Sequence, residues 1–145
     1  MPKTSGAINR IIDANINRAK EGLRVCEEIT RFILNHRSLT SDFKKIRHRI
    51  DAILKILPSR TTLLKERRSL SDVGKNIYIG ELKRKNYQDI FFANIQRIKE
   101  SLRVLEEFAK IKNKRSATKF KEIRYRIYEI EKRAASKIPF LCGHR

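Results

Sequence analysis

The segment NINRAKEGLRVCEEI, residues 15–29, occurs a second time in the chain as NIQRIKESLRVLEEF, residues 94–108. Ten of the fifteen aligned positions are identical. A second block follows each copy, FKKIRHRI at residues 43–50 and FKEIRYRI at residues 120–127. The offset between the copies changes from 79 residues in the first block to 77 in the second, so the copies differ in length between the blocks. This pattern predicts two copies of one helical hairpin.

Apolar residues, with one threonine among them, recur in both copies in steps of three and four, which is the period of an amphipathic helix. In the first copy this stripe comprises Ile12, Ile16, Ala19, Leu23, Cys26, Thr30 and Ile33. In the second copy it comprises Phe91, Ile95, Ile98, Leu102, Leu105 and Ala109. The second blocks carry similar stripes over residues 43–57 and 120–130. We therefore expect an all-α protein, a helical bundle with four main helices.

The composition agrees with long helices around one hydrophobic core. The chain has 145 residues, of which 40% are hydrophobic, and this is the size of one domain. It contains 5 Gly, 3 Pro and no Trp, which argues against a turn-rich β-sandwich. We expect a single helical domain over residues 1–145, with repeat 1 at about 7–58, a connecting segment at 59–85 and repeat 2 at about 86–138.

Polar residues and prolines predict where the helices begin and end. The predicted N-terminal caps are Thr4 or Ser5, Thr40 or Ser41, Asn86, and Ser116 or Thr118. Pro58 and Pro139 are expected to end the second and the last main helix. In the connecting segment we expect a short helix over Thr62–Arg67 and then an irregular loop, which turns at Asp72 with Gly74 at positive φ. Because long ordered loops tend to be functional, this loop is a candidate part of a site.

The charge of the chain predicts an anionic partner. Lys and Arg number 35 against 16 Asp and Glu, which gives a formal net charge of +19. Such a field attracts nucleic acid, acidic membranes or phosphorylated small molecules, although a thermophile-like surface has the same composition. No run approaches about 18 apolar residues, so we expect no membrane-spanning helix. Residues 1–10 lack the apolar stretch of a signal peptide, which predicts a cytoplasmic protein with Cys26 and Cys142 as free thiols.

Several polar residues are identical in the two copies, and two interpretations of them are open. In the first, they form ion pairs on the helix surface, such as Arg24 with Glu28, each worth about 0.2–0.5 kcal/mol in an isolated helix. In the second, they line a pocket, because Asn15, Arg18 and Gly22 lie at i, i+3 and i+7 on one helix face. A glycine inside a helix costs about 1 kcal/mol relative to alanine, and close approach by another backbone or a ligand would explain it. This favours a polar pocket where the repeated helices cross.

Common catalytic and phosphate-binding motifs are missing from the sequence. It contains neither GxxxxGK[ST] nor GxGxxG, the usual glycine-rich phosphate cradles. Its three His residues form no Ser-His-Asp or Cys-His arrangement that the sequence reveals. Phosphate binding would therefore depend on arginine, whose planar fork matches two phosphate oxygens at once.

Four segments of the chain resemble the helical hydroxymethylpyrimidine phosphate kinase domain that is often fused ahead of thiamine-phosphate synthase. These are RIIDANINRAKEGLRVCEE (10–28), RRSLSDVG (67–74), ANIQRIKESLRVLEEF (93–108) and IRYRIYEIE (123–131). The resemblance implies phosphoryl transfer from ATP, with Mg²⁺, to hydroxymethylpyrimidine phosphate, a step of thiamine biosynthesis that gives the diphosphate. No βα pattern of a synthase follows these segments, so we expect a stand-alone version of the domain.

The central motif of this family usually reads like R-D-T-x-x-D-V-G-T. Here Arg67, Asp72, Val73 and Gly74 match the motif, whereas Arg68 stands where an acid is usual. Ser69 replaces the first threonine and Lys75 replaces the last one. Asp72 is therefore the acid of this motif that the chain retains.

The resemblance and the chemistry of phosphoryl transfer together give the candidate site residues. The candidates for binding substrate and phosphate are Asn15, Arg18, Arg24, Arg67, Gly74, Asn94, Arg97, Arg103 and Arg124. The candidates for catalysis are the acids Asp72, Glu21 and Glu100, which would hold Mg²⁺ or accept the proton of the attacking phosphate oxygen. Asp72 is the candidate metal ligand.

Two other functions compete with the kinase. The first is RNA binding, which the net charge and the basic run from Lys110 to Lys121 support. Most Phe and Tyr residues fall on predicted core stripes, so few aromatic platforms for stacking bases are expected. The second is a non-catalytic helical protein that docks on a separate thiamine-phosphate synthase.

Overall fold

The computed structural model describes residues 2–57, 60–76 and 82–139, and every regular element in these ranges is helical. The elements are α1 (Pro2–Glu28), a π-helical turn (Ile29–Ile33), α2 (Arg37–Leu54), α3 (Arg60–Glu66), a 3₁₀ turn (Ser69–Ser71), α4 (Tyr87–Lys112) and α5 (Lys114–Ala135). The described residues contain no strand, so the predicted all-α class is confirmed. None of these helices is both long and apolar enough to cross a bilayer.

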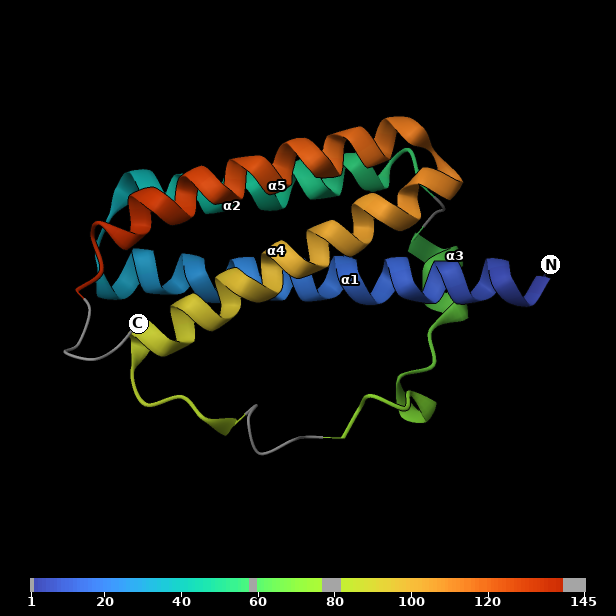
Figure 1. The fold of residues 1–145 in the computed structure, drawn as a ribbon, viewed down its shortest axis with the longest axis horizontal. Helices are drawn as coiled ribbons and strands as arrows, with labels where there is room; N and C mark the ends of the chain where they lie inside the picture. The colour runs from blue at the N-terminus through green and yellow to red at the C-terminus, as the bar shows by residue number, and fades with distance from the viewer. Residues whose placement is uncertain (1, 58–59, 77–81, 140–145) are drawn as a thin grey trace.

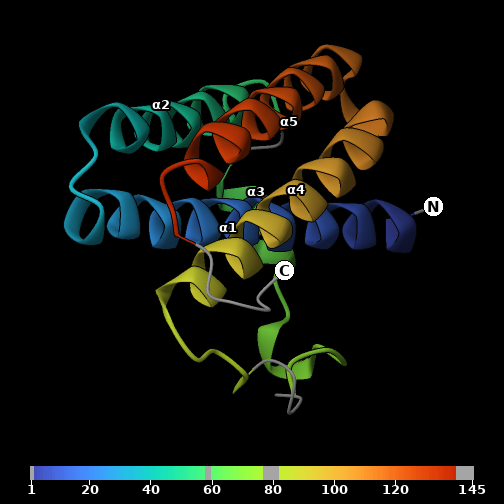
Figure 2. The ribbon, with the colours of Figure 1, turned by 60° about the vertical axis from the view of Figure 1, so that its left-hand side comes forward.

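The four long helices form two hairpins, α1 with α2 and α4 with α5 (Figure 1). Helices α1 and α4 run in opposite directions and cross each other, and their contact is the most extensive between any two described elements. Helices α2 and α5 lie side by side on one side of this crossing (Figures 1 and 2). The described residues that follow α3, 67–76 and 82–86, lie on the other side of this crossing.

The predicted stripes form the core of the bundle. Almost all of their members are buried, from Ile12 in α1 to Ala109 in α4. Phe43 of α2 and Phe91 of α4 belong to different repeats, and their rings meet edge to face with centroids 6.1 Å apart. Edge-to-face packing of this kind is favourable beyond the area that it buries. The two hairpins therefore share one hydrophobic cluster.

Ile33 is an exception to the predicted stripe, because 53% of its surface is exposed. The chain forms a π-helical turn at this point, in which the amide of Leu34 donates to the carbonyl of Ile29, five residues earlier. A π turn holds more residues than an α turn, so the steps of three and four no longer point to the core. Asn35, at φ 51°, then reverses the chain into α2.

Of the four predicted N-terminal helix caps, one is confirmed. Asn86 caps α4, and its side chain accepts a hydrogen bond from the amide of Asp89, as predicted. The other predictions were wrong, since α1 begins at Pro2, the Nδ1 of His36 caps α2, and Asn113 caps α5. In each case helical geometry continues N-terminal to the predicted residue.

Two main helices were predicted to end at a proline, and the structure describes one of these prolines, Pro139. Helix α2 ends at Leu54 and α5 at Ala135, in both cases a few residues before a proline. Pro58 itself lies outside the described residues, and so does Cys142. Cys26 is a free, buried thiol that donates to the carbonyl of Phe91, and its burial raises its pKa.

One ion pair occurs at the same place in both hairpins. Glu27 of α1 binds Arg47 of α2, with Oε1 2.7 Å from Nε. Glu106 of α4 binds Arg124 of α5, with both nitrogens 3.0 Å from Oε1. These residues match at the repeat offsets of 79 and 77, and the two carboxylates are among the most buried charges of the chain. The repeated Glu at this position therefore ties the two helices of each hairpin together.

Gly22 lies where α1 passes closest to α4. A Cβ atom at this position would lie 2.8 Å from Cγ1 of Ile98 and 3.4 Å from the carbonyl oxygen of Asn94. Of the two explanations for Gly22, another backbone or a ligand, the structure supports close approach of a neighbouring helix, with the side chain of Ile98 nearest and the backbone of Asn94 next. Its counterpart in the second repeat is Ser101, which carries the small side chain that this side of the crossing accommodates.

We expect the substitution Gly22→Ala to destabilise the protein. Alanine removes the helix penalty of about 1 kcal/mol, but crowding a packed interface costs about 1–3 kcal/mol. Chemical denaturation should therefore give a lower free energy of unfolding than the parent. The matched control is Ser101→Ala, where a Cβ atom is already present, and we expect it to destabilise the protein less than Gly22→Ala does. A Gly22→Ala variant more stable than the parent would contradict this account of the crossing.

Candidate active site

The two repeats meet at a cavity of about 510 Å³ between α1 and α4, here named the crossing cavity. Its lining residues are Asn15, Arg18, Glu21, Gly22, Gly74, Asn94, Arg97, Glu100, Ser101 and Val104. Four of the lining residues on α1 have their counterparts in the second repeat, 79 residues later, among the lining residues on α4. The two copies of the motif therefore contribute to one cavity instead of forming two separate sites.

A second cavity of about 690 Å³ lies between α1 and the connecting segment, and we name it the loop cavity. Its lining residues are Arg10, Ile11, Asp13, Ala14, Asn15, Asn17, Arg18, Glu21, Arg67, Arg68, Ser69, Ser71, Asp72 and Val73. Asn15, Arg18 and Glu21 line both cavities, so the two are adjacent. A substrate with two separate parts can lie across this boundary, with one part in each cavity.

Asn15 and Asn94 occupy equivalent places in the two helices. Each Nδ2 donates to the backbone carbonyl four residues earlier, Ile11 for Asn15 and Ile90 for Asn94, at 2.8 Å in both cases. This bond fixes the orientation of the amide and directs its donor to the helix. Within the described ranges neither amide oxygen accepts a hydrogen bond from the protein, so both remain available as acceptors for a ligand.

The repeated arginines fall into two groups. Arg18 and Arg97 line the crossing cavity and form no ion pair with any residue that the structure describes. Arg24 and Arg103 lie outside both cavities on the exposed helix surface, where Arg24 is 3.8 Å from Glu27 and Arg103 is 3.3 Å from Glu107. The structure thus brings the first two together as candidate phosphate ligands and places the second two with helix carboxylates.

Arg124 also lies away from both cavities. Its guanidinium binds Glu106 and donates to the hydroxyl of Tyr128 at 2.9 Å, and its side chain is only 9% exposed. Burial lowers the pKa of Arg124, but the hydrogen bonds with Glu106 and Tyr128 outweigh it, so the pKa is raised overall. Arg124 therefore ties α4 to α5, and the structure does not bring it together with the candidates that line the two cavities.

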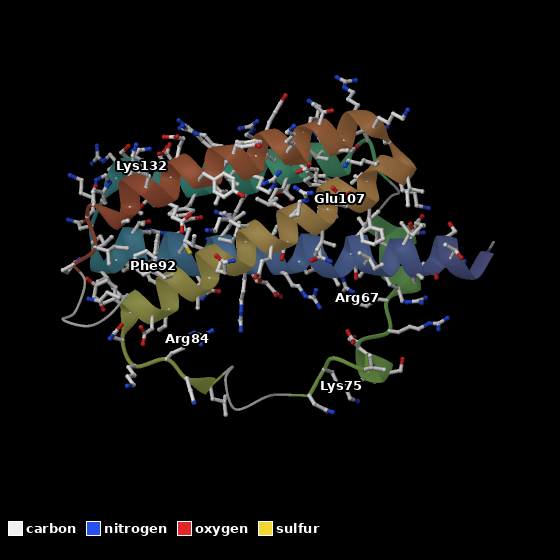
Figure 3. All side chains as sticks on the ribbon, viewed as in Figure 1. Arg67, Lys75, Arg84, Phe92, Glu107 and Lys132 are labelled. Atoms are coloured by element: carbon white, nitrogen blue, oxygen red, sulfur yellow. The ribbon has the colours of Figure 1, made fainter. Side chains whose placement is uncertain are left out.

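Arg67 follows directly after α3 and holds the connecting segment against α1 (Figure 3). Its Nε and Nη2 each lie 2.8 Å from one carboxylate oxygen of Asp13, a bidentate pair. The hydrogen bonds to Asp13 raise the pKa of Arg67. The candidate Arg67 thus lines the loop cavity with its fork already occupied by a protein carboxylate, which fixes the near end of the loop.

Asp13 was missed by the sequence interpretation. It is nearly buried, and Asn17 also donates to its Oδ1, at 3.3 Å. The repeat itself contained the signal, because the counterpart of Asp13 in the second copy is Phe92, an apolar residue. A charge present in only one copy points to a contact that only one copy makes, and here that contact is with the connecting segment.

Asp72 lies on the exposed loop that lines the loop cavity. Its Oδ1 accepts a hydrogen bond from the amide of Gly74 at 2.7 Å, so the predicted turn is present. The predicted positive φ at Gly74 was wrong, because its backbone is outside the left-handed region. The side chain of Asp72 closes the turn, so a left-handed residue is not required. Leu70 and Val73 beside it are 87% and 95% exposed.

The acids of the two cavities suit a cation that is held in part by a phosphate ligand. Glu21 lines both cavities, Glu100 lines the crossing cavity, and Asp72 lines the loop cavity. No three His, Cys, Asp or Glu residues come together as a metal site within the described ranges. Mg²⁺ at phosphate sites is commonly held by one or two carboxylates plus substrate phosphates, and the donor set here fits that mode.

Two tyrosines of α5 are exceptions to the expectation that most Phe and Tyr residues fall on core stripes. Tyr125 is 54% and Tyr128 is 39% exposed, and their rings meet edge to face at 5.7 Å. Arg124 lies over both rings, at 5.1 Å and 5.8 Å from their centroids. The core stripe of α5 runs through Ile123 and Ile127, so the tyrosines lie on the neighbouring face.

Comparison with known proteins finds relatives over most of the chain. The sequence matches the ThiD2 family over residues 10–133, a range that includes every residue lining the two cavities. A protein of Synechocystis named thiamine-phosphate synthase is 37% identical over 126 residues, which are 86% of this chain and 35% of that protein. One of Rhodopirellula baltica with the same name is 38% identical over 125 residues, 86% of this chain and 33% of that protein.

The chain spans about a third of the length of the curated relatives that it matches. No solved structure matches it. The family match covers most of the chain, and it includes both copies of the repeat and the loop between them. On this evidence the chain belongs to the ThiD2 family.

Proposed function

We propose that this protein acts in thiamine biosynthesis and transfers a phosphoryl group from ATP to hydroxymethylpyrimidine phosphate. The observation that carries the proposal is the position of Arg18 and Arg97, two arginines without a protein partner in the described structure, in a cavity next to the Asp72 loop. Membership of the ThiD2 family and relatives named thiamine-phosphate synthase support the pathway. The resemblance described above supports the kinase reaction.

The residues of the two cavities suit phosphoryl transfer, which needs positioning and charge neutralisation more than covalent chemistry. In the reaction an oxygen of the acceptor phosphate forms a bond to the γ-phosphorus of ATP, and the bond between that phosphorus and the β–γ bridging oxygen breaks. Arg18 and Arg97 would bind and orient the phosphates. Asp72 and Glu21 would hold Mg²⁺, which neutralises phosphate charge when bound. Glu100 remains as a proton acceptor.

An assay of ADP release tests the proposal. The protein is incubated with ATP, Mg²⁺ and either hydroxymethylpyrimidine phosphate or unphosphorylated hydroxymethylpyrimidine. We expect ADP release that depends on Mg²⁺ and on the phosphorylated acceptor. The absence of ADP release with either acceptor would contradict the proposal and would favour a non-catalytic partner of a separate synthase.

The substitution Asp72→Asn distinguishes the structural role of Asp72 in the turn from the role of its negative charge in the reaction. An asparagine oxygen can still accept the hydrogen bond from Gly74, so the loop geometry is expected to persist. The carboxylate charge is lost, and we expect turnover to fall about 100-fold or more, as for the loss of an acid–base group or a metal ligand. Steady-state kinetics at several Mg²⁺ concentrations measure this effect. Turnover within twofold of the parent would exclude Asp72 from the reaction.

RNA binding is a second candidate, and the exposed tyrosines of α5 favour it. Tyr125 and Tyr128 are exposed and lie among basic side chains, such as Lys121 at 6.0 Å from the ring of Tyr125. Stacking platforms within a basic surface are typical of proteins that bind single strands. This surface lies on α5, away from both cavities, so substitutions can test the two functions separately.

A further inference from the structure

The crossing cavity, unlike the loop cavity, has two walls that repeat each other. Asn, Arg and Glu line it at equivalent positions of α1 and α4. Arg18 and Glu21 of α1 face the cavity, and Arg97 and Glu100 of α4 face it at the equivalent positions of the second repeat. All four side chains belong to exposed residues. Since α1 and α4 run in opposite directions, the cavity presents two like half-sites to one ligand.

Two like half-sites suit a ligand with two like halves. Each half-site offers one guanidinium without an ion pair in the described structure, and a guanidinium fork binds one phosphoryl unit well. We propose that the crossing cavity binds the magnesium complex of a diphosphate group, with Arg18 and Arg97 each holding one phosphoryl unit. The cavity of about 510 Å³ is within the usual range for a small-molecule site.

The carboxylates explain why the ligand is the magnesium complex. Glu21 and Glu100 line the same cavity and would repel a free diphosphate anion. A hydrated Mg²⁺ bound to the diphosphate places a cation between the ligand and these carboxylates, and Mg²⁺ commonly keeps its waters in such sites. The inference refines the proposed function, on which it rests for the choice of phosphate ligands.

Calorimetric titration with inorganic pyrophosphate tests the inference without any turnover. With Mg²⁺ present, we expect pyrophosphate to bind at least about tenfold more tightly than inorganic phosphate, because the second phosphoryl unit binds intramolecularly. Arg18→Ala and Arg97→Ala should each weaken pyrophosphate binding by about 10- to 100-fold, and by similar factors. Omission of Mg²⁺ should also weaken binding.

The control variants are Lys44→Ala and Lys121→Ala. These lysines also match between the repeats, are exposed on α2 and α5, and lie outside both cavities. They remove the same charge, and we expect affinity to change by less than about twofold, as for screened charges at a distance. Thermal melting of each variant shows whether it is folded.

Three results would overturn the inference. These are pyrophosphate binding no tighter than phosphate binding, a loss with only one of the two arginine variants, and an equal loss with the lysine variants. The proposed function is tested separately by ADP release. A protein that binds magnesium pyrophosphate through both arginines but releases no ADP retains this inference and loses the kinase assignment.

Discussion

The substitution Arg97→Ala is expected to lower kcat/KM for ATP-dependent phosphoryl transfer by about 100-fold or more. Loss of a single positioned donor to a developing charge costs about 100- to 1000-fold in well-studied enzymes. Arg97 is exposed to the crossing cavity and has no ion pair to replace within the described chain, so its removal should leave the fold intact. Steady-state kinetics and a thermal melt of the variant measure the two effects.

A triple variant of basic residues provides the contrast. Lys112 is the last residue of α4, Lys114 and Lys119 lie in the first two turns of α5, and none of them lines either cavity. Their neutralisation should leave turnover unchanged and should reduce any retention of an RNA oligonucleotide, because each lost phosphate contact lowers a salt-dependent affinity. Full turnover in the Arg97 variant, with turnover lost in the lysine variant, would reverse the assignment. RNA binding with a steep salt dependence and no turnover in the parent would favour the second candidate.

The second large effect concerns stability. We expect Arg124→Leu to lower the free energy of unfolding by about 3–5 kcal/mol, because it leaves the carboxylate of Glu106 buried without its partner. Chemical denaturation monitored by circular dichroism measures the loss. In the first hairpin, Arg47→Leu should act in the same direction through Glu27.

A double variant distinguishes the buried charge from simple loss of packing. When Arg124→Leu is combined with Glu106→Leu, no uncompensated charge remains, and apolar replacement of buried ion pairs is often neutral or stabilising. We therefore expect the double variant to recover most of the stability. If the double variant is as unstable as Arg124→Leu alone, packing and not charge accounts for the effect.

The hairpins could be predicted from the sequence because the repeat is local and periodic. Buried positions in a helix follow from steps of three and four, and a duplicated pattern reduces chance agreement. The π-helical turn at Ile29–Ile33 could not be predicted, since its register depends on how the chain enters α2. The same holds for the cap of α2, where the ring nitrogen of His36 takes the role that Thr and Ser usually have.

The predicted site residues do not all lie together, for a geometric reason. Arg18 and Arg24 are both repeated, but six residues correspond to about 600° of helical rotation, so they lie on different faces of α1. The same spacing separates Arg97 from Arg103, and both pairs behave alike in the structure. Helix geometry alone could have made this distinction. The contact of Asp13 with Arg67 joins residues 54 positions apart, so the difference between the two copies marks Asp13 but does not identify its partner.

Phosphorus NMR of a complete reaction tests the central claim most directly, because it identifies the molecule that receives the phosphoryl group. The parent protein is mixed with ATP, Mg²⁺ and hydroxymethylpyrimidine phosphate, and the Arg97→Ala variant is run in parallel. We predict that the acceptor monophosphate signal is replaced by the two coupled signals of a diphosphate as ATP becomes ADP, and that the variant shows neither change. Formation of ADP and free phosphate with the acceptor unchanged would contradict phosphoryl transfer to hydroxymethylpyrimidine phosphate.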